Sequence, residues 1–105
     1  MSSSTDDSGP DPADRVQVTR DDAASRYEGR IGDTLVGVAD FHLVRTTVVI
    51  THTGTEPRWR GQGVAGELTR QVLDDIRAGG RRVHPMCPYT ERYIDEHPSY
   101  TDLLA

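Results

Sequence analysis

Two glycines and two arginines surround the start of an apolar helical pattern in the segment RWRGQGVA, residues 58–65. The first N–H groups of a helix have no partner within the helix and carry partial positive charge. Gly61 and Gly63 lack side chains, so an anion can approach the backbone closely, and Arg58 and Arg60 add donors suited to phosphate. The pattern predicts a phosphate or diphosphate site. The alternative is a tight turn whose glycines only allow a sharp entry into the helix.

This loop lacks the defining residues of two common phosphate-binding patterns. No lysine followed by serine or threonine comes after the glycines, as a P-loop requires. Neither the third glycine nor the acidic ribose partner of a dinucleotide-binding loop is in place. Trp59 lies between the two arginines, and we expect it to pack beneath the loop rather than to contact a base.

Three other residue types are candidates for proton or group transfer. Imidazole titrates near neutrality, so His52 is the best candidate for a general base, although a histidine in a strand is more often structural. Cys87 is either a nucleophile or a buried small apolar residue. Tyr89 and Tyr93 lie four residues apart on one face of a predicted helix, where they either donate a proton or simply pack. No histidine pair has zinc-ligand spacing, so no metal is expected.

The first half of the chain has the patterns of an antiparallel meander. Alternating or β-branched residues predict strands over 15–19, 25–31, 34–45 and 46–53, the last of them largely buried. Gly32–Asp33 is a hairpin signal between the second and third strands.

The second half changes to a helical period. Apolar residues recur four apart and predict one helix face, which Gly79–Gly80 ends: Val64, Leu68, Val72 and Ile76. A short strand over 81–89, broken by prolines, and a last helical turn or two over 90–97 follow. Strand, glycine loop, helix and strand form a crossover, so we expect strands 46–53 and 81–89 to be parallel neighbours in an α+β fold.

Composition places the chain among small globular domains. Residues 1–15 are rich in Ser, Asp and Pro and predict a disordered tail, which leaves one domain over 16–105. The net charge is −5, and four aspartates against one arginine in the tail account for −3 of it. This balance argues against nucleic-acid binding, and no apolar run reaches membrane-spanning length. A single cysteine favours the reducing cytoplasm. No feature demands an oligomer.

Four motifs in order resemble a known family. RGQGVA (60–65) looks like the signature of the GNAT acyltransferase superfamily. His52-Thr53, Pro85-Met86-Cys87-Pro88-Tyr89 and His97-Pro98-Ser99-Tyr100 are similar to motifs of its small single-domain members, and the likeness covers most of residues 25–104. The resemblance implies a minimal GNAT-like fold with acetyl-coenzyme A as cosubstrate. One departure stands out: Gly54 occupies the position after His-Thr where that family commonly has an acid, and Glu56 follows two residues later.

The resemblance also implies roles for individual residues. Coenzyme A is expected in the gap between the strand ending near Thr53 and the strand near Cys87. The residues expected to bind it are Thr53, Gly54, Thr55, Arg58, Arg60, Gly61, Gln62, Gly63, Val64, Ala65 and Pro88. The candidates for acyl transfer are Cys87, His52, Tyr89, Tyr93 and Glu56.

Two functions remain open from the sequence. The first is an acyl-coenzyme A-dependent N-acyltransferase. Direct passage from strand to strand at 32–34 omits the helices that wall the acceptor site in larger members, which favours a protein or peptide amine as acceptor. The second is a coenzyme A-binding module with little or no turnover, favoured by Gly54 and by the missing helices.

Overall fold

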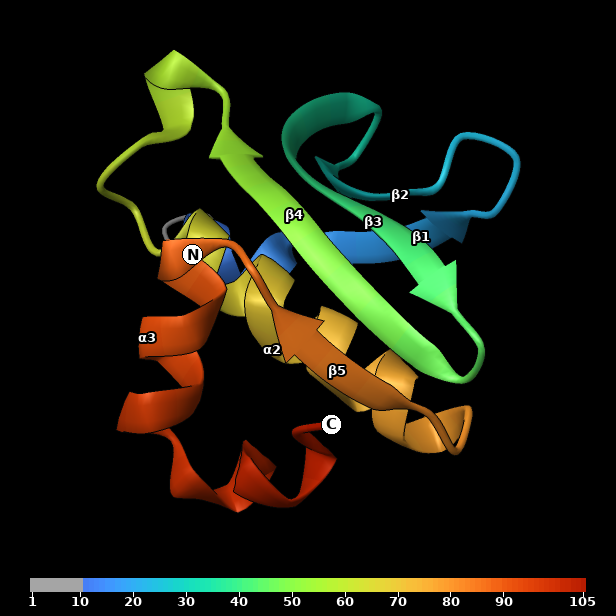
Figure 1. Ribbon diagram of the computed structural model, residues 1–105. Helices are drawn as coiled ribbons and strands as arrows, with labels where there is room; N and C mark the ends of the chain where they lie inside the picture. Colours follow the sequence, from blue (N-terminus) through green and yellow to red (C-terminus); the bar gives the residue numbers. More distant parts are fainter. Residues whose placement is uncertain (1–10) are drawn as a thin grey trace.

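A computed structural model describes residues 11–105 of the chain (Figure 1). Five strands are present in this part: β1 (Gln17–Asp21), β2 (Arg26–Ile31), β3 (Thr34–Val44), β4 (Thr47–Thr55) and β5 (Arg82–Pro85). Two α-helices and three 3-10 helices complete it: α2 (Val64–Ala78), α3 (Pro88–Glu96), η1 (Pro12–Arg15), η2 (Pro57–Trp59) and η3 (Pro98–Leu103). None of these helices is long and apolar enough to cross a membrane.

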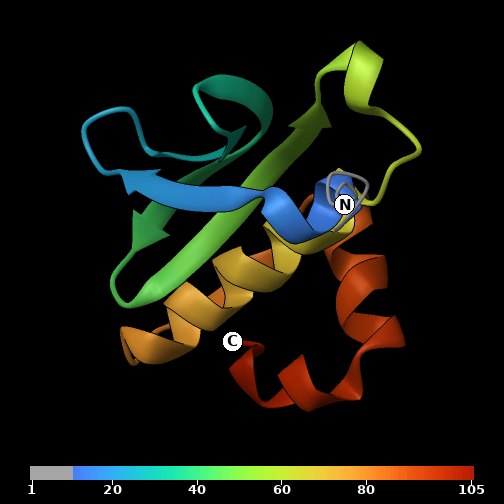
Figure 2. The same ribbon diagram turned by 180° about the vertical axis from the view of Figure 1, so that it is seen from behind.

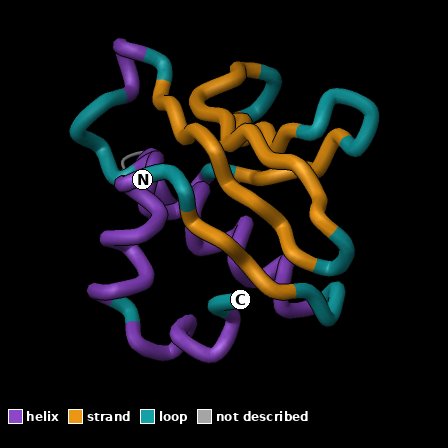
Figure 3. The backbone as a smooth tube through the Cα atoms, viewed as in Figure 1, coloured by secondary structure: helices purple, strands orange, loops and turns teal. Residues whose placement is uncertain are grey.

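The strands form one mixed sheet in the order β1-β2-β3-β4-β5 (Figure 3). The first four strands pair antiparallel, and β5 pairs parallel to β4. The meander, the parallel neighbours and the α+β class predicted from the sequence are therefore confirmed.

Some limits of the predicted elements differ from the structure. The final helix begins at Pro88, two residues earlier than expected, because proline is well tolerated at the first helical position. Pro12–Arg15, assigned to the tail from composition, form the turn η1, while residues 1–10 lie outside the described residues. The 3-10 helix η3 was not predicted.

Strand β4 is buried over only part of its length. Val48, Val49 and Ile50 are at most 5% exposed, but Thr51 and His52 are exposed. The expectation of a largely buried strand is wrong for its second half. The reason is that pairing with β5 ends at Ile50 and Pro85, so the rest of β4 has no strand on that side.

Helices α2 and α3 lie on the same face of the sheet, as the two opposite views in Figures 1 and 2 show. The buried face of α2 carries Leu68, Leu73 and Ile76, each at most 1% exposed. Gly29 and Gly37 face each other across β2 and β3, and a Cβ on either would lie 3.4 Å from Leu68. The two glycines thus let α2 approach the sheet closely. Within residues 11–105, no helix covers the opposite face.

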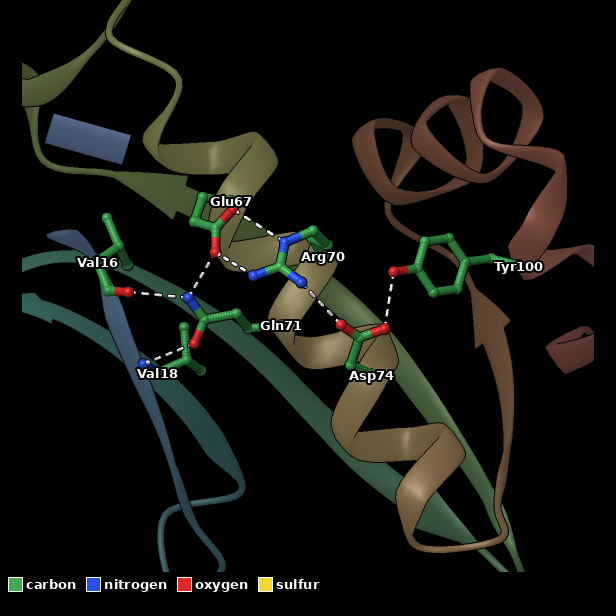
Figure 4. Close-up of polar contacts among 7 residues, drawn as sticks. All are labelled: Val16, Val18, Glu67, Arg70, Gln71, Asp74 and Tyr100. Atoms are coloured by element: carbon green, nitrogen blue, oxygen red, sulfur yellow. Dashed lines mark hydrogen bonds and ion pairs between the residues drawn. The ribbon is translucent and has the colours of Figure 1, made fainter. Parts of the chain in front are cut away.

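A side-chain amide of α2 occupies the outer edge of the sheet (Figure 4). The Gln71 Nε2 donates to the Val16 carbonyl at 2.8 Å, and the Val18 N–H donates to Gln71 Oε1 at 3.2 Å. Gln71 therefore bonds β1 in the way that a residue of a neighbouring strand does.

The opposite side of α2 is tied to the C-terminal segment. Arg70 donates to Glu67 and to Asp74, and the Tyr100 hydroxyl donates to Asp74 at 2.7 Å (Figure 4). Burial and the Asp74 charge raise the pKa of Tyr100 to about 12, so its hydroxyl keeps the proton that holds η3 against α2.

Two glycine substitutions should change stability in opposite directions. A Cβ at Gly37 would lie 3.2 Å from the Gly54 carbonyl oxygen, so Gly37→Ala should lower the free energy of unfolding by about 1–3 kcal/mol. Gly66 lies within α2, and a Cβ there would lie 3.6 Å from its nearest neighbour, the Tyr89 hydroxyl. Gly66→Ala should therefore raise the free energy of unfolding by about 0.5–1 kcal/mol through helix propensity. Urea unfolding measures both, and a neutral Gly37→Ala would contradict the close helix–sheet contact.

Candidate active site

A cleft of about 680 Å³ opens where β4 extends past the end of β5. Strands β3 and β4, the loop after β4, and the first turns of α2 and α3 all contribute to it. Its lining is Val38, His52, Thr53, Gly54, Thr55, Glu56, Trp59, Arg60, Gly61, Gly63, Val64, Ala65, Gly66 and Tyr89.

The cleft exists because β5 is short and the chain leaves the sheet after Pro85. The Cys87 N–H donates to the Ile50 carbonyl at 3.0 Å, and α3 begins at the next residue. Residues 51–55 of β4 continue, paired only with β3. This is the gap expected between Thr53 and Cys87.

The two loop glycines differ in what surrounds them. Both have left-handed backbone angles, with φ of 74° at Gly61 and 82° at Gly63. A Cβ on Gly61 would meet nothing within 4 Å, whereas a Cβ on Gly63 would lie 3.2 Å from Ala13 of η1. A ligand can therefore approach the loop at Gly61, while η1 closes the side of Gly63.

Side chains of the loop hold it against β4. The Arg60 Nε donates to the Thr55 carbonyl at 3.3 Å, and the Gln62 Nε2 donates to the Arg58 carbonyl at 3.0 Å. Arg60 lines the cleft, but Arg58 and Gln62 do not. These two residues stabilise the loop from outside.

Trp59 packs against a small apolar cluster of Val16, Val36 and Val64, which confirms the expected packing. The Arg58 guanidinium lies 5.9 Å from the centre of its ring. The Trp59 Nε1 is buried and has no acceptor in the part of the chain that the structure describes.

The donors around Gly61 suit a diphosphate. The first backbone bond of α2 runs from Glu67 N–H to the Gly63 carbonyl, so the N–H groups of residues 64–66 have no partner in the helix. Arg60 adds a guanidinium, and the space at Gly61 lets an anion reach the backbone. Hence the residues present fit the anionic end of coenzyme A.

Cys87 lies at the N-cap position of α3, close to two threonines. Cys87 is 7% exposed and does not itself line the cleft, although the neighbouring Thr53 and Tyr89 do. The hydroxyls of Thr53 and Thr90 lie 3.4 Å apart, and Thr90 is 2% exposed. Burial by itself raises the pKa of the Cys87 thiol, but the Thr90 N–H, the Thr53 hydroxyl and the Tyr89 N–H stabilise the thiolate, so the pKa lies below its usual value.

His52 and Gly54 line the cleft from the face of the sheet that no described helix covers. Thr53 between them points the other way, toward Thr90. Glu56 is exposed at the cleft mouth, where its N–H donates to the Val36 carbonyl at 2.8 Å.

The two candidate tyrosines have different surroundings. The Tyr89 hydroxyl lies 3.6 Å from the position of a Cβ on Gly66, so it is inside the cleft, and burial raises its pKa. Tyr93 does not line the cleft and stacks on His97 at 3.9 Å between ring centres. His97 Nδ1 lies 2.8 Å from the Tyr93 carbonyl, so the imidazole caps a carbonyl near the end of α3.

Pro88 is exposed at the start of α3 and does not line the cleft. Conversely, four residues of the site did not emerge from the sequence: Val38, Gly66, Thr90 and Ala13. Val38 could have been predicted from strand alternation, because it pairs with Gly54 and lies on the same face of the sheet. The others depend on contacts between distant segments. Among residues 11–105, no group of three or more His, Cys, Asp and Glu is placed to share a metal ion.

One family model matches most of the chain, and a relative and two solved structures are similar to it. Residues 26–103 match the model of the GCN5-related N-acetyl-transferase family. Protein NATD1 of Xenopus tropicalis is 27% identical over 91 residues, which cover 84% of this chain and 83% of that protein. A GCN5-like protein from Staphylococcus aureus has a similar structure, with a TM-score of 0.65, 18% identity, and coverage of 87% of this chain and 89% of the other. A ribosomal-protein alanine N-acetyltransferase from Escherichia coli gives a TM-score of 0.58 at 12% identity, over 91% of this chain and 59% of its own.

The threonines should control the ionisation of Cys87. In wild-type protein, the rate of alkylation by iodoacetamide should reach half its maximum at a lower pH than for free cysteine. Thr90→Val keeps the volume but removes a hydroxyl beside the sulfur, so the midpoint should move to higher pH. Thr101→Val, in the exposed part of η3, is the control and should leave the midpoint unchanged. An unchanged midpoint in Thr90→Val would show that the hydroxyl does not act on the thiol.

Proposed function

This chain belongs to the GCN5-related N-acetyltransferase family, and from that premise we propose that it transfers an acetyl group from acetyl-coenzyme A to an amine. The observation that carries the proposal is the cleft itself. It joins the unpaired edge of β4 to the first turns of both α-helices, with Gly61 open to a ligand.

The diphosphate of acetyl-coenzyme A would lie at Gly61 and the first N–H groups of α2, with Arg60 beside it. The amides of the pantetheine arm would pair with the backbone of residues 53–55, whose edge has no strand partner on the cleft side. This arrangement leads the thioester toward Thr53 and Tyr89.

Direct transfer would use residues on the two sides of β4. His52 faces the uncovered side of the sheet, from which an amine can enter, and would take the amine proton as general base. The nitrogen attacks the thioester carbonyl carbon, and the carbon–sulfur bond breaks. Tyr89 would protonate the leaving thiolate, since its raised pKa keeps the phenol protonated near neutral pH.

A second route passes through Cys87. Its thiolate would attack the thioester carbonyl, form a new thioester on Sγ and release the coenzyme A thiolate, which takes a proton from Tyr89. The amine would then take the acetyl group from Sγ and regenerate the thiol. The lowered pKa supports this route, and the 7% exposure of Cys87 requires the side chains that cover it to move aside.

An acceptor on a protein or peptide fits the open face better than an enclosed metabolite does. No described helix walls the side of the sheet that carries His52 and Gly54, so a bulky acceptor meets no steric barrier there.

Binding of coenzyme A without turnover is the second candidate function. Gly54 supports it, because it removes the acid that commonly follows His-Thr in the family. Turnover separates the two functions: a binder releases no coenzyme A thiol from acetyl-coenzyme A in the presence of peptides with free amines.

Two alanine substitutions test the loop. Gly61 and Gly80 both have positive φ and open space at the Cβ position, so alanine should destabilise both to a similar degree, by about 1 kcal/mol. Of these two glycines, Gly61 lines the cleft and Gly80 does not. Gly61→Ala should weaken acetyl-coenzyme A binding about tenfold or more, the loss expected when one or two charge-assisted backbone contacts are disturbed, while Gly80→Ala keeps the affinity. The fluorescence of Trp59, the single tryptophan, measures binding. Equal affinities in both variants would show that Gly61 only forms a turn and takes no part in binding.

Mass spectrometry separates the two transfer routes. The chain contains no lysine, since all 12 of its basic residues are arginine, so a self-acetylated amine can only be the α-amino group. An acetyl mass that hydroxylamine removes and that Cys87→Ala abolishes would indicate the thioester on Sγ. Turnover that persists in Cys87→Ala would instead indicate direct transfer.

A further inference from the structure

The imidazole of His52 lies along β4 in the space that Gly54 leaves free. A Cβ at position 54 would have His52 Nε2 at 3.0 Å, Cε1 at 3.7 Å and Cδ2 at 3.9 Å as its three nearest neighbours. Residues two apart in a strand share a face, and the Nε2 end of the ring is the part closest to Gly54. Both residues line the cleft.

The backbone at position 54 does not itself require glycine. Its φ is not in the left-handed region, unlike those of Gly61 and Gly63. All three of the nearest atoms that a side chain would meet belong to His52. A Cβ contact of 3.0 Å is tighter than nine in ten of those found in proteins, so the neighbouring atom must give by a few tenths of an ångström, and a ring at the end of a side chain yields more easily than a strand. Any other residue here would therefore displace the imidazole rather than the backbone.

Space rather than hydrogen bonding sets the position of the ring. Within the described residues, His52 makes no side-chain hydrogen bond. Asp40 is its cross-strand partner on β3, but that carboxylate accepts from Arg26 Nε at 3.2 Å. Glu56 and Arg60 are the charged side chains that line the cleft together with His52. Val38, opposite Gly54, is apolar and offers the ring no polar anchor.

We propose that Gly54 is a positioning residue, whose missing side chain lets His52 turn Nε2 into the cleft and take the proton of the acceptor amine. The inference rests on the proposed function and deepens it. It gives a role to the open space at position 54, which the imidazole fills.

Gly54→Ala is the direct test. With acetyl-coenzyme A and a pool of short peptides carrying free α-amino and lysine groups, the turnover rate at saturating acetyl-coenzyme A should fall about threefold or more, because the ring must move by a few tenths of an ångström and a shift of about 1 Å at a reacting group costs about a hundredfold. The KM for acetyl-coenzyme A should stay close to the wild-type value.

The same substitution in a His52→Ala background is the matched control. If Gly54 acts only through His52, alanine at position 54 should cause no further loss when the ring is absent. A further loss of equal size in that background overturns the inference, because the glycine then serves the substrate or the strand directly. Unchanged turnover in Gly54→Ala overturns it as well.

NMR distinguishes this failure from failure of the proposed function. In wild-type protein, His52 ring protons should show nuclear Overhauser contacts to the Gly54 Hα protons, and Gly54→Ala should lose the corresponding contacts. If the wild type turns over but shows no contacts between His52 and Gly54, the positioning role of Gly54 is wrong and the proposed function stands. Absence of turnover in the wild type, with the contacts present, removes the catalytic role of His52 together with the proposed function.

Discussion

The end of the pairing between β4 and β5 is the constraint on which the site depends. Pairing stops at Ile50 and Pro85, and the last link is the bond from Cys87 N–H to the Ile50 carbonyl. Backbone groups beyond this point must find partners outside the sheet, because unpaired polar groups are costly when they are covered. Helix α2 begins beside this edge, so its unpaired first N–H groups face the cleft, whereas the first N–H groups of α3 are directed at the Cys87 sulfur. Backbone rather than side chains therefore supplies most of the donors that an extended, anionic ligand needs.

Successive side chains of β4 point to opposite faces of the sheet. Thr53 points toward α3, where it meets Thr90 beside Cys87. His52 and Gly54 point to the face that no described helix covers. The edge of β4 thus lies between a buried thiol on one side and an exposed histidine on the other. A small fold can hold both groups because the period of a strand is two residues.

Local patterns in the sequence were enough to predict the five strands and the two α-helices, though not the 3-10 helices. The β-branched run before residue 54, the four-residue apolar period of α2 and Gly79–Gly80 at its end each depend on neighbours in the chain. What could not be predicted depends on contacts between distant segments. Ala13 lies against Gly63 across fifty residues of chain, and Thr90 becomes part of the site only because α3 docks beside Thr53. The position of the His52 ring depends on three-dimensional distances that no local pattern in the sequence contains.

The side-chain amide of Gln71 has a consequence for how this chain behaves among its own copies. A sheet with one bare face and a free outer strand is a template for the addition of another chain, which is a common start of aggregation. Gln71 satisfies both the carbonyl of Val16 and the N–H of Val18, so a guest strand would have to displace it before it could pair there. The amide does this without adding a residue to the sheet. The fold can therefore leave one face bare for an acceptor and still discourage self-association at the edge beside it, a form of protection that costs a single side chain.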